Sequence, residues 1–268
     1  MKLDIKNNKT LVMGILNVTP DSFSDAGLFA DANKAVLHAR QMVKDGADII
    51  DIGGESSRPG SNSISEEEEI KRVVPVIKKL VKNIKVPLSI DTYKPAVAKA
   101  CLDLGVQLVN DITGLSNQKM IDTISKFKVP VVIMHMKGKP KNMQDAPVYA
   151  DVVMEIKQFL RQRIMKARKS GITDIIIDPG IGFGKTAQHN LQIIKRLSEF
   201  KDLKCPILVG TSRKSFIGSV TGLLVNERLE GTLASISIAV MNGANIVRVH
   251  DVKECKRAVQ VADAIKGA

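Results

Sequence analysis

Ile175-Ile-Ile-Asp-Pro-Gly-Ile-Gly-Phe-Gly-Lys185 is a short apolar run that ends in a polar residue and a glycine-rich turn, and a helical pattern follows it at 187–200. The same arrangement recurs along the whole chain. Nearly continuous apolar runs lie at 11–18, 48–52, 87–91, 108–112, 131–136, 175–178, 206–210 and 246–250. Such runs are typical of parallel strands that are covered on both faces. We therefore predict a series of strand–helix units.

Helical patterns separate these runs and include 30–44, 148–170, 187–200 and 229–242. Ser65 followed by Glu66, Glu67, Glu68 and Glu69 predicts a capped helix start, and Pro95 predicts the start of the next helix. Glycines predict several helix ends, at Gly46, Gly105, Gly171 and Gly243.

Eight such units in 268 residues average about 33 residues each, the length of a βα repeat. We predict an α/β fold, a single (β/α)8 TIM barrel over residues 1–268, with a doubly wound open sheet as the alternative. A short hairpin is one interpretation of residues 2–10, which precede the first unit.

The composition, with 44% hydrophobic and 25% charged residues, is that of a globular chain. No apolar run reaches the roughly 18 residues of a membrane span, and the mostly polar residues 1–10 do not resemble a signal peptide. The three cysteines are far apart, which argues against a disulfide framework or a structural zinc site. We expect a cytoplasmic protein that does not bind membranes.

The net charge is +12, from 40 Lys and Arg against 28 Asp and Glu. Such an excess favours an anionic partner: nucleic acid, an anionic membrane surface or a phosphorylated substrate. Aromatic residues make up only 3% of the chain, with no tryptophan, which argues against a stacking platform for nucleic acid. We therefore expect no nucleic-acid partner, although charge alone does not choose among the others.

Polar side chains follow every predicted strand, at the end where a (β/α)8 barrel carries its active site. Arg58, Lys214, Arg248 and His250 supply donors suited to phosphate oxygens, in loops rich in Gly and Ser. Because Arg248 and His250 are two residues apart on a strand, both project to one face. These positions predict a phosphate-binding site.

A second set consists of Asp91, Asn110 and Asp178. An amide supplies both a donor and an acceptor, and a carboxylate accepts two parallel N–H bonds, so this set suits the edge of a heterocycle. Together the two sets predict a small ligand that carries both a ring and a phosphate.

Other interpretations apply to neighbouring positions. Asp111 and Asp251 are suited to cap the helices that follow them. His135, after four apolar residues, is interpreted as an interior histidine, with its role left open. Phe23 and Phe183 lie in polar loops and are interpreted as covers for a ligand.

Residues 179–186 match the phosphate-binding P-loop pattern except at its first position, where Pro179 replaces glycine. Proline has a fixed φ and no N–H to donate, so it suits that position poorly. A phosphate loop at this segment is a minor hypothesis.

The chain resembles the dihydropteroate synthases of the folate pathway. The matching motifs run in family order over essentially the whole chain and are Gly14-Ile-Leu-Asn-Val-Thr-Pro-Asp-Ser-Phe-Ser-Asp25, Asp51-Ile-Gly-Gly-Glu-Ser-Ser-Arg-Pro-Gly60, Ser89-Ile-Asp-Thr-Tyr-Lys-Pro95, Val109-Asn-Asp-Ile112, Met134-His-Met-Lys-Gly138, Asp178-Pro-Gly-Ile-Gly-Phe-Gly184, Gly210-Thr-Ser-Arg-Lys-Ser215 and Arg248-Val-His-Asp251. Departures from the family pattern are small, at Ala26, Ser57 and Tyr93. Of these, Tyr93 raises a question about packing beside Asp91.

The resemblance implies a transferase that condenses 6-hydroxymethyl-7,8-dihydropterin diphosphate with para-aminobenzoate, giving 7,8-dihydropteroate and pyrophosphate. It also implies a homodimer and the cofactor Mg²⁺, with Asn17 as the metal ligand. In the family, cleavage of the C–O bond is thought to run ahead of attack by the amine.

The resemblance further implies site residues by motif position. Those assigned to catalysis are Asp91, Lys214 and Arg248. Those assigned to the pterin are Asp91, Asn110, Asp178, Lys214 and Arg248. Those assigned to the diphosphate are Ser57, Arg58, Arg248 and His250. Those assigned to the aminobenzoate are Pro59, Phe183 and Ser215, beneath mobile loops at about 19–29 and 53–65.

Two rival functions make different demands on the sequence. A methyltetrahydrofolate-binding methyltransferase domain would share the pterin-binding set but would not need Arg58, Lys214 and the Arg248–His250 pair. A nucleic-acid-binding module predicts clustered basic residues interleaved with aromatics, which this sequence lacks.

Overall fold

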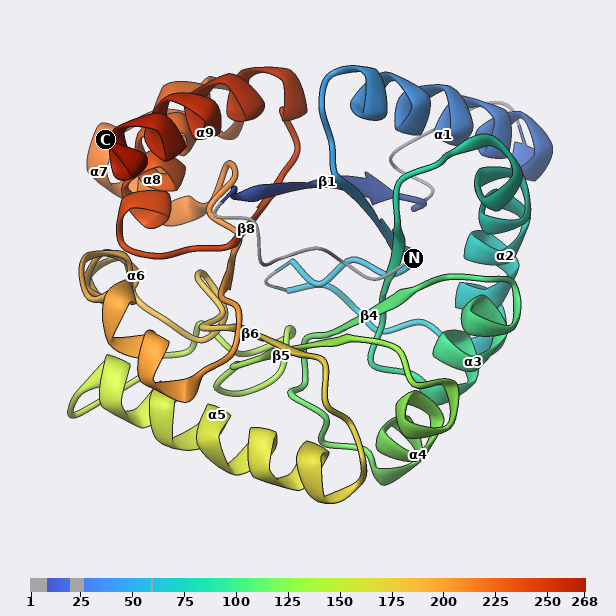
Figure 1. Ribbon diagram of the computed structural model, residues 1–268, viewed down its shortest axis with the longest axis horizontal. Coiled ribbons are helices and arrows are strands. Elements are labelled where there is room, and N and C mark those ends of the chain that lie inside the picture. The colour runs from blue at the N-terminus through green and yellow to red at the C-terminus, as the bar shows by residue number, and fades with distance from the viewer. Residues whose placement is uncertain (1–8, 20–26, 59) are drawn as a thin grey trace.

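The computed structural model describes residues 9–19, 27–58 and 60–268, and it confirms the predicted (β/α)8 barrel (Figure 1). Within these residues, eight parallel strands form one sheet in the order β6-β5-β4-β3-β2-β1-β8-β7. A parallel bridge between Ile177 and Ile207 links β6 to the segment before β7 and closes the ring. The strands are β1 (Leu11–Asn17), β2 (Ile49–Gly53), β3 (Leu88–Asp91), β4 (Leu108–Asp111), β5 (Val131–Met134), β6 (Ile175–Asp178), β7 (Leu208–Val209) and β8 (Ile246–Val249).

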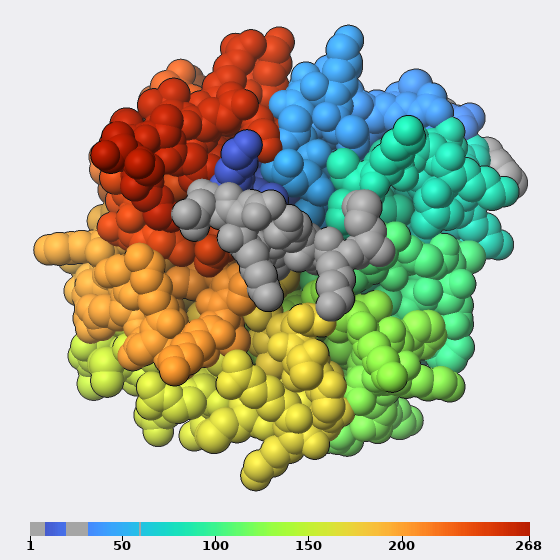
Figure 2. Space-filling model, in the orientation of Figure 1, coloured from blue at the N-terminus to red at the C-terminus, as the bar shows by residue number. Residues whose placement is uncertain are grey.

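Helices surround this ring and follow the strands in chain order, so that α9 returns to the side of α1 (Figure 1). The chain order is also visible in the space-filling view, where the colours run round the molecule (Figure 2). The helices are α1 (Gly27–Lys44), α2 (Glu66–Asn83), α3 (Pro95–Asp103), α4 (Gln118–Phe127), α5 (Val152–Lys169), α6 (Ala187–Lys195), α7 (Ser215–Thr221), α8 (Leu229–Met241) and α9 (Val252–Gly267).

Several predicted helix boundaries are confirmed. Ser65 caps α2 by accepting the N–H of Glu68 at 3.2 Å, and α3 begins at Pro95. The four glycines predicted at helix ends each lie two positions after a helix and have positive φ, a conformation that glycine adopts without steric cost. Local sequence signals therefore determine these helix ends.

Other boundaries differ from the prediction. The helix predicted at 148–170 begins only at Val152, because the Asp151 side chain accepts the N–H groups of Val153 and Met154 at 2.9 and 3.0 Å. The helix predicted at 187–200 divides into α6 and a 3₁₀ helix, η2 (Leu197–Leu203). Strands β5 and β7 are shorter than predicted.

Buried apolar side chains form two layers. The larger layer fills the space between the outer face of the sheet and the helices. The smaller layer fills the inside of the barrel and consists of Met13, Ile49, Leu108, Val132, Ile176, Leu208 and Ile246. Because these side chains close the interior, a ligand can enter only above them, at the strand ends.

Some predictions fall outside the described residues. Most of the proposed hairpin at 2–10 does so, as do Phe23 and Pro59 and much of the loop predicted at 19–29. Among the residues that are described, no helix is both long and apolar enough to cross a membrane. The cytoplasmic location stays a prediction.

Candidate active site

The strand period of two places polar side chains directly above the inner apolar layer. Ile176 is followed two positions later by Asp178, and Ile246 by Arg248. Residues two apart on a strand face the same side, so both polar side chains point into the mouth of the barrel. The same rule applies around the ring and gathers residues that are far apart in the sequence.

A pocket with about 440 Å³ of empty space opens at this mouth. The predicted site residues that line it are Ser57, Asp91, Asn110, Asp178, Phe183, Lys214, Arg248 and His250. Its other lining residues are Ile15, Ile112, Met134, Gly210 and Ser212. Sequence analysis did not assign these residues to the site, because small and apolar residues at strand ends carry little chemical signal of their own.

Of the predicted site residues that the structure describes, three do not line this pocket. Arg58 is exposed in the segment after β2, and Ser215 is exposed as the first residue of α7. Asn17, the last residue of β1, is half-buried. Arg58 directly follows the lining residue Ser57, and Asn17 is paired in the sheet with Gly53, which neighbours Asp91, whereas Ser215 is exposed to solvent.

Asn17, Gly53, Asp91 and Asn110 form one row across four neighbouring strands. The strand register pairs Asn17 with Gly53, Gly53 with Asp91, and Asp91 with Asn110. A Cβ atom at Gly53 would lie 3.7 Å from Asn17 Oδ1 and 3.9 Å from Asp91 Oδ2. Because glycine has no side chain, the space between these two oxygens stays open.

Two carboxylates hold Arg248 from below and from the side. Its Nε donates to Asp51 Oδ2 at 2.6 Å, and its Nη2 donates to Asp91 Oδ2 at 2.7 Å. Asn110 Nδ2 donates to the same Asp51 oxygen at 3.0 Å. Asp51 is fully buried, and its Oδ1 has no hydrogen-bond partner in the part of the chain that the structure describes. Sequence analysis assigned Asp51 no role. Its position two residues after the inward-facing Ile49 does indicate that its side chain points into the barrel.

Burial raises the pKa of the Asp91 carboxyl to about 7, Arg248 opposes this rise, and the charge of Asp51 adds to it. Asp91 can therefore take either protonation state near neutral pH. An N–H donor on a bound ring would favour the carboxylate form, because it would satisfy the buried charge.

Asp178 and Lys214 form the opposite wall. Asp178 Oδ1 accepts the N–H of Gly180 at 2.7 Å, and burial raises the pKa of this carboxyl while Lys214 opposes the rise. Lys214 Nζ donates to the carbonyl of Ile181 and lies 4.5 Å from the centre of the Phe183 ring. Burial lowers the pKa of Lys214 to about 8, against the attraction of Asp178. The wall thus combines an acceptor, a cation and an aromatic face.

His250 is oriented by Ser212 in the neighbouring turn. Ser212 Oγ accepts the backbone N–H of His250 at 3.2 Å and lies 3.0 Å from its Nδ1. The Ser212 hydroxyl therefore has its proton free to donate to Nδ1, which assigns the ring proton to Nε2. Burial and the neighbouring cation of Arg248 lower the pKa of His250 to about 4. At neutral pH the ring is thus an uncharged donor.

Lys185 shows that residues 179–186 are not a P-loop. Its Nζ lies 3.0 Å from Nδ1 of His135 and donates to the carbonyls of His135 and Phe183 at 3.3 and 2.9 Å. The side chain is 2% exposed, so it is directed into the protein instead of toward a ligand. His135 is an interior histidine, as predicted, and burial together with Lys185 lowers its pKa to about 2.

The predicted caps at Asp111 and Asp251 are both wrong. Asp111 accepts the N–H of Thr113 at 2.7 Å and stabilises the turn after β4, whereas Asn117 caps α4. Asp251 makes no side-chain cap and instead forms an ion pair with Arg213. In both cases a nearer partner competes successfully for the carboxylate.

Comparisons with known proteins agree with this geometry. The family model described as "Pterin binding enzyme" matches residues 13–250. The dihydropteroate synthase of Escherichia coli (strain K12) is 46% identical over 259 residues, which cover 96% of this chain and 92% of the relative.

Two solved structures extend the likeness to the fold. The Yersinia pestis dihydropteroate synthase, in a sulfonamide drug complex, superposes with a TM-score of 0.94 at 44% identity and covers 100% of this chain and 98% of its own. The Xanthomonas albilineans dihydropteroate synthase, with 4-aminobenzoic acid, has a TM-score of 0.92 at 42% identity. The match covers 99% of this chain and 96% of the Xanthomonas chain. The chain therefore belongs to the pterin-binding enzyme family, and within it to the dihydropteroate synthases.

Proposed function

We propose that this pocket condenses 6-hydroxymethyl-7,8-dihydropterin diphosphate with para-aminobenzoate, giving 7,8-dihydropteroate and pyrophosphate. The observation that carries the proposal is that one pocket is lined by two kinds of polar side chain. Asp91, Asn110 and Asp178 supply acceptors and an amide, and Lys214 and His250 supply N–H donors. A ring with N–H groups fits the first set, and an anionic leaving group fits the second.

The pterin ring is proposed to lie between the carboxylates. Asp178 and Asn110 are 7% and 4% exposed, so their hydrogen bonds to a ligand would be shielded from water. Asp178 keeps one oxygen, Oδ2, that is not engaged by Gly180 and can accept ring N–H groups. The planar guanidinium of Arg248, fixed by Asp51 and Asp91, offers a flat surface against the ring.

The diphosphate is proposed to lie toward Ser57, Arg58 and His250. Ser57 lines the pocket, Arg58 lies next to it, and the Nε2–H of His250 donates without adding charge. Lys214 lines the same pocket and its charge interacts with that of Asp178, so its ammonium is proposed to contact both the ring and the leaving oxygen. These donors stabilise the negative charge that develops on the diphosphate.

In the condensation, the C–O bond to the diphosphate breaks and its electron pair leaves with the oxygen. The amine nitrogen of aminobenzoate then forms the new C–N bond and releases one proton to solvent. Positive charge develops on the pterin methylene when cleavage runs ahead of attack, and the carboxylate of Asp91 stabilises it. No protein nucleophile takes part, so the residues act by binding and by electrostatics.

The row of strand ends is a suitable place for Mg²⁺. Asn17 Oδ1 is a neutral hard oxygen, and the open space beside Gly53 admits further ligands to an ion. Asn17 would hold one coordination position, and the diphosphate oxygens and water would supply the rest. When bound, Mg²⁺ would neutralise charge on the leaving diphosphate.

The direct test incubates the purified chain with both substrates and Mg²⁺ and measures pyrophosphate and dihydropteroate. We expect equal amounts of the two products, no dihydropteroate without aminobenzoate, and competition between a sulfonamide and aminobenzoate. Asn17→Ala should raise the Mg²⁺ concentration for half-maximal rate by about tenfold, as the loss of one oxygen ligand does. Pyrophosphate release that does not depend on aminobenzoate would contradict the proposal.

We also propose a homodimer that uses the outer faces of the C-terminal helices. Helices α7, α8 and α9 lie together on one side of the barrel (Figure 1), and large apolar side chains are exposed on α7, on the segment after it and along α8 and α9. They are Val220, Leu223, Leu224, Val225, Ile238, Met241, Val261 and Ile265. Exposed apolar groups in one region favour association of two copies. Sedimentation equilibrium should give twice the chain mass, and Leu224→Glu with Ile238→Glu should give the monomer.

A further inference from the structure

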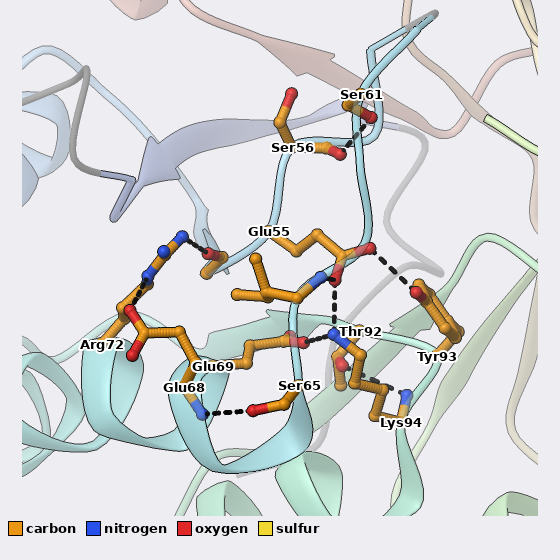
Figure 3. Close-up of polar contacts among 12 residues, drawn as sticks. Glu55, Ser56, Ser61, Ser65, Glu68, Glu69, Arg72, Thr92, Tyr93 and Lys94 are labelled. Atoms are coloured by element: carbon orange, nitrogen blue, oxygen red, sulfur yellow. Dashed lines mark hydrogen bonds and ion pairs between the residues drawn. The ribbon is translucent and has the colours of Figure 1, made fainter. Parts of the chain in front are cut away.

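The segment that joins β2 to α2, residues 54–65, is called the β2–α2 loop below. It carries Ser57 and Arg58, the residues proposed to contact the diphosphate. Glu55 lies near its start, with a side chain that is 11% exposed. Figure 3 shows that the Glu55 carboxylate faces the turn after β3, where Tyr93 and Lys94 contact it.

One carboxylate closes the base of the loop. Glu55 Oε2 accepts the backbone N–H of Ile64 at 3.0 Å, although the two residues are nine positions apart. The same oxygen also accepts from the ammonium of Lys94 (Figure 3). The start and the end of the loop are therefore joined through a single buried group.

The other carboxylate oxygen is held by Tyr93, whose hydroxyl donates to Glu55 Oε1 at 2.8 Å. Tyr93 is the departure from the family pattern that raised a packing question beside Asp91. The structure answers it, since the side chain extends from the turn toward Glu55 (Figure 3) and Tyr93 does not line the pocket.

Lys94 connects this group to the first turn of α2. Its Nζ donates to Glu69 Oε2 at 2.6 Å, and the Lys94 and Glu69 residues are 7% and 1% exposed. One ammonium thus lies between two carboxylates, one from the start of the loop and one from the first turn of α2. Buried charge-assisted hydrogen bonds are stronger than those at the surface, so this is a firm attachment.

The outer part of the loop has weaker ties. Ser61 Oγ donates to the carbonyl of Ser56 at 2.6 Å, and the N–H of Ser61 donates to the carbonyl of Arg58 at 3.1 Å. Gly60 N–H donates to the carbonyl of Pro140 at 3.1 Å. These neutral bonds shape the outer part, whereas the charged contacts of Glu55 place its base.

We infer that Glu55 is a positioning residue for diphosphate binding, which holds Ser57 and Arg58 at the pocket through its bonds to Tyr93, Lys94 and Ile64. The inference rests on the proposed function. It adds a link between the two halves of the substrate site: Asp91, assigned to the ring, and Tyr93, which holds the loop, are two positions apart at the end of β3.

The test compares Glu55→Gln and Tyr93→Phe with Glu67→Gln as the matched control. Glu67 is an exposed residue in the first turn of α2 and forms no hydrogen bond or ion pair with Glu55 among the described residues. Affinities are measured by calorimetry for the pterin diphosphate and for 6-hydroxymethyl-7,8-dihydropterin, which lacks the diphosphate. Hydrogen exchange of the amides at 56–58 and 61–64 is followed without ligand, and thermal unfolding is recorded for each variant.

Glu55→Gln should weaken binding of the pterin diphosphate about tenfold, and Tyr93→Phe should weaken it about threefold. Neither variant should change the affinity for 6-hydroxymethyl-7,8-dihydropterin by more than about twofold. KM for the pterin diphosphate should rise by the same factors with kcat changed less, and the loop amides should exchange faster. Glu67→Gln should match the wild type in each measurement.

Equal losses of affinity for the two ligands would overturn the inference, because they would indicate a general structural role. Unchanged diphosphate affinity with unchanged exchange would also overturn it. If Glu55→Gln does not fold, the affinities of Tyr93→Phe decide the question, because this substitution removes only one hydroxyl. A wild type that binds both ligands but forms no dihydropteroate would contradict the proposed function, while the ratio of affinities would still decide the role of Glu55.

Discussion

Arg248 and Asp51 form an ion pair across the inside of the barrel, with 2.6 Å between Nε and Oδ2. They belong to β8 and β2, which flank β1 on either side. The pair directs a second guanidinium nitrogen to Asp91, at 2.7 Å, and leaves the flat face of Arg248 toward the pocket. Asp51 touches no part of the proposed ligand and acts by positioning Arg248 and Asn110.

Asp51→Asn should therefore lower kcat/KM roughly 10–100-fold, because small displacements of groups that position a substrate have effects of this size. It should also lower the unfolding free energy by about 3 kcal/mol, since a buried ion pair loses one partner. Steady-state kinetics and urea unfolding measure the two effects. Asp103→Asn, which breaks an exposed pair with Lys99, is the control and should change the unfolding free energy by less than about 1 kcal/mol.

The pKa of Lys214, lowered to about 8 by burial, predicts a pH dependence of activity. The charged form binds the leaving diphosphate, so kcat/KM for the pterin diphosphate should fall as pH rises through about 8. Lys214→Arg should retain part of the activity and lose this fall, because guanidinium stays charged. A Lys214→Arg profile with the same fall would assign the titration to another group.

The lowered pKa of Lys214 also makes the unfolding free energy depend on pH, and this contribution rises with pH while activity falls. Between pH of about 8 and the ordinary lysine value of 10.5, the folded chain binds fewer protons at Lys214 than the unfolded chain. The contribution of Lys214 to the unfolding free energy therefore rises with pH across this window. Lys214→Met should remove that rise, as urea unfolding at pH 8 and 10 can show.

Asp178→Ala and Lys214→Ala should each abolish most turnover while the barrel remains folded, because both side chains lie above the apolar layer that stabilises the interior. Asp178→Asn retains an acceptor for the Gly180 N–H but offers the ring only a neutral oxygen. We expect it to fold like the wild type and to lose at least about 100-fold in kcat/KM. Wild-type rates of dihydropteroate formation in any of these variants would contradict the assignments.

Lys185→Met tests whether the segment after β6 binds phosphate. We expect a loss of about 1–3 kcal/mol in unfolding free energy, since buried carbonyls of His135 and Phe183 lose their donor. The affinity for pyrophosphate should stay within about threefold, because Lys185 is directed into the protein. A large loss of pyrophosphate affinity in a variant of unchanged stability would restore the P-loop hypothesis.

Much of the fold was predictable because it depends on local patterns. Apolar runs give the strands, and Ser65 and Pro95 mark helix starts through bonds within a few residues. The strand period also predicted that Arg248 and His250 project to one face, and both line the pocket. The register that aligns Asn17, Gly53, Asp91 and Asn110 follows from the closed sheet and has no signal in any one segment.

Within the site, the errors concern carboxylates with more than one available partner. Asp251 pairs with Arg213, which the turn after β7 places beside it, so local capping rules did not predict its role. Asp51 and Glu55 are supported by residues from other strands and turns, and only the folded barrel shows these contacts. Competition among distant partners is therefore what the sequence does not reveal.

The most direct test of the central claim is a crystal structure of the chain with hydroxymethylpterin and pyrophosphate. The account predicts the pterin ring in the pocket, with its N–H groups on Asp178 and Asn110, and the pyrophosphate beside Ser57 and His250. A pterin bound elsewhere, or a ring and a pyrophosphate in exchanged positions within the pocket, would contradict the account.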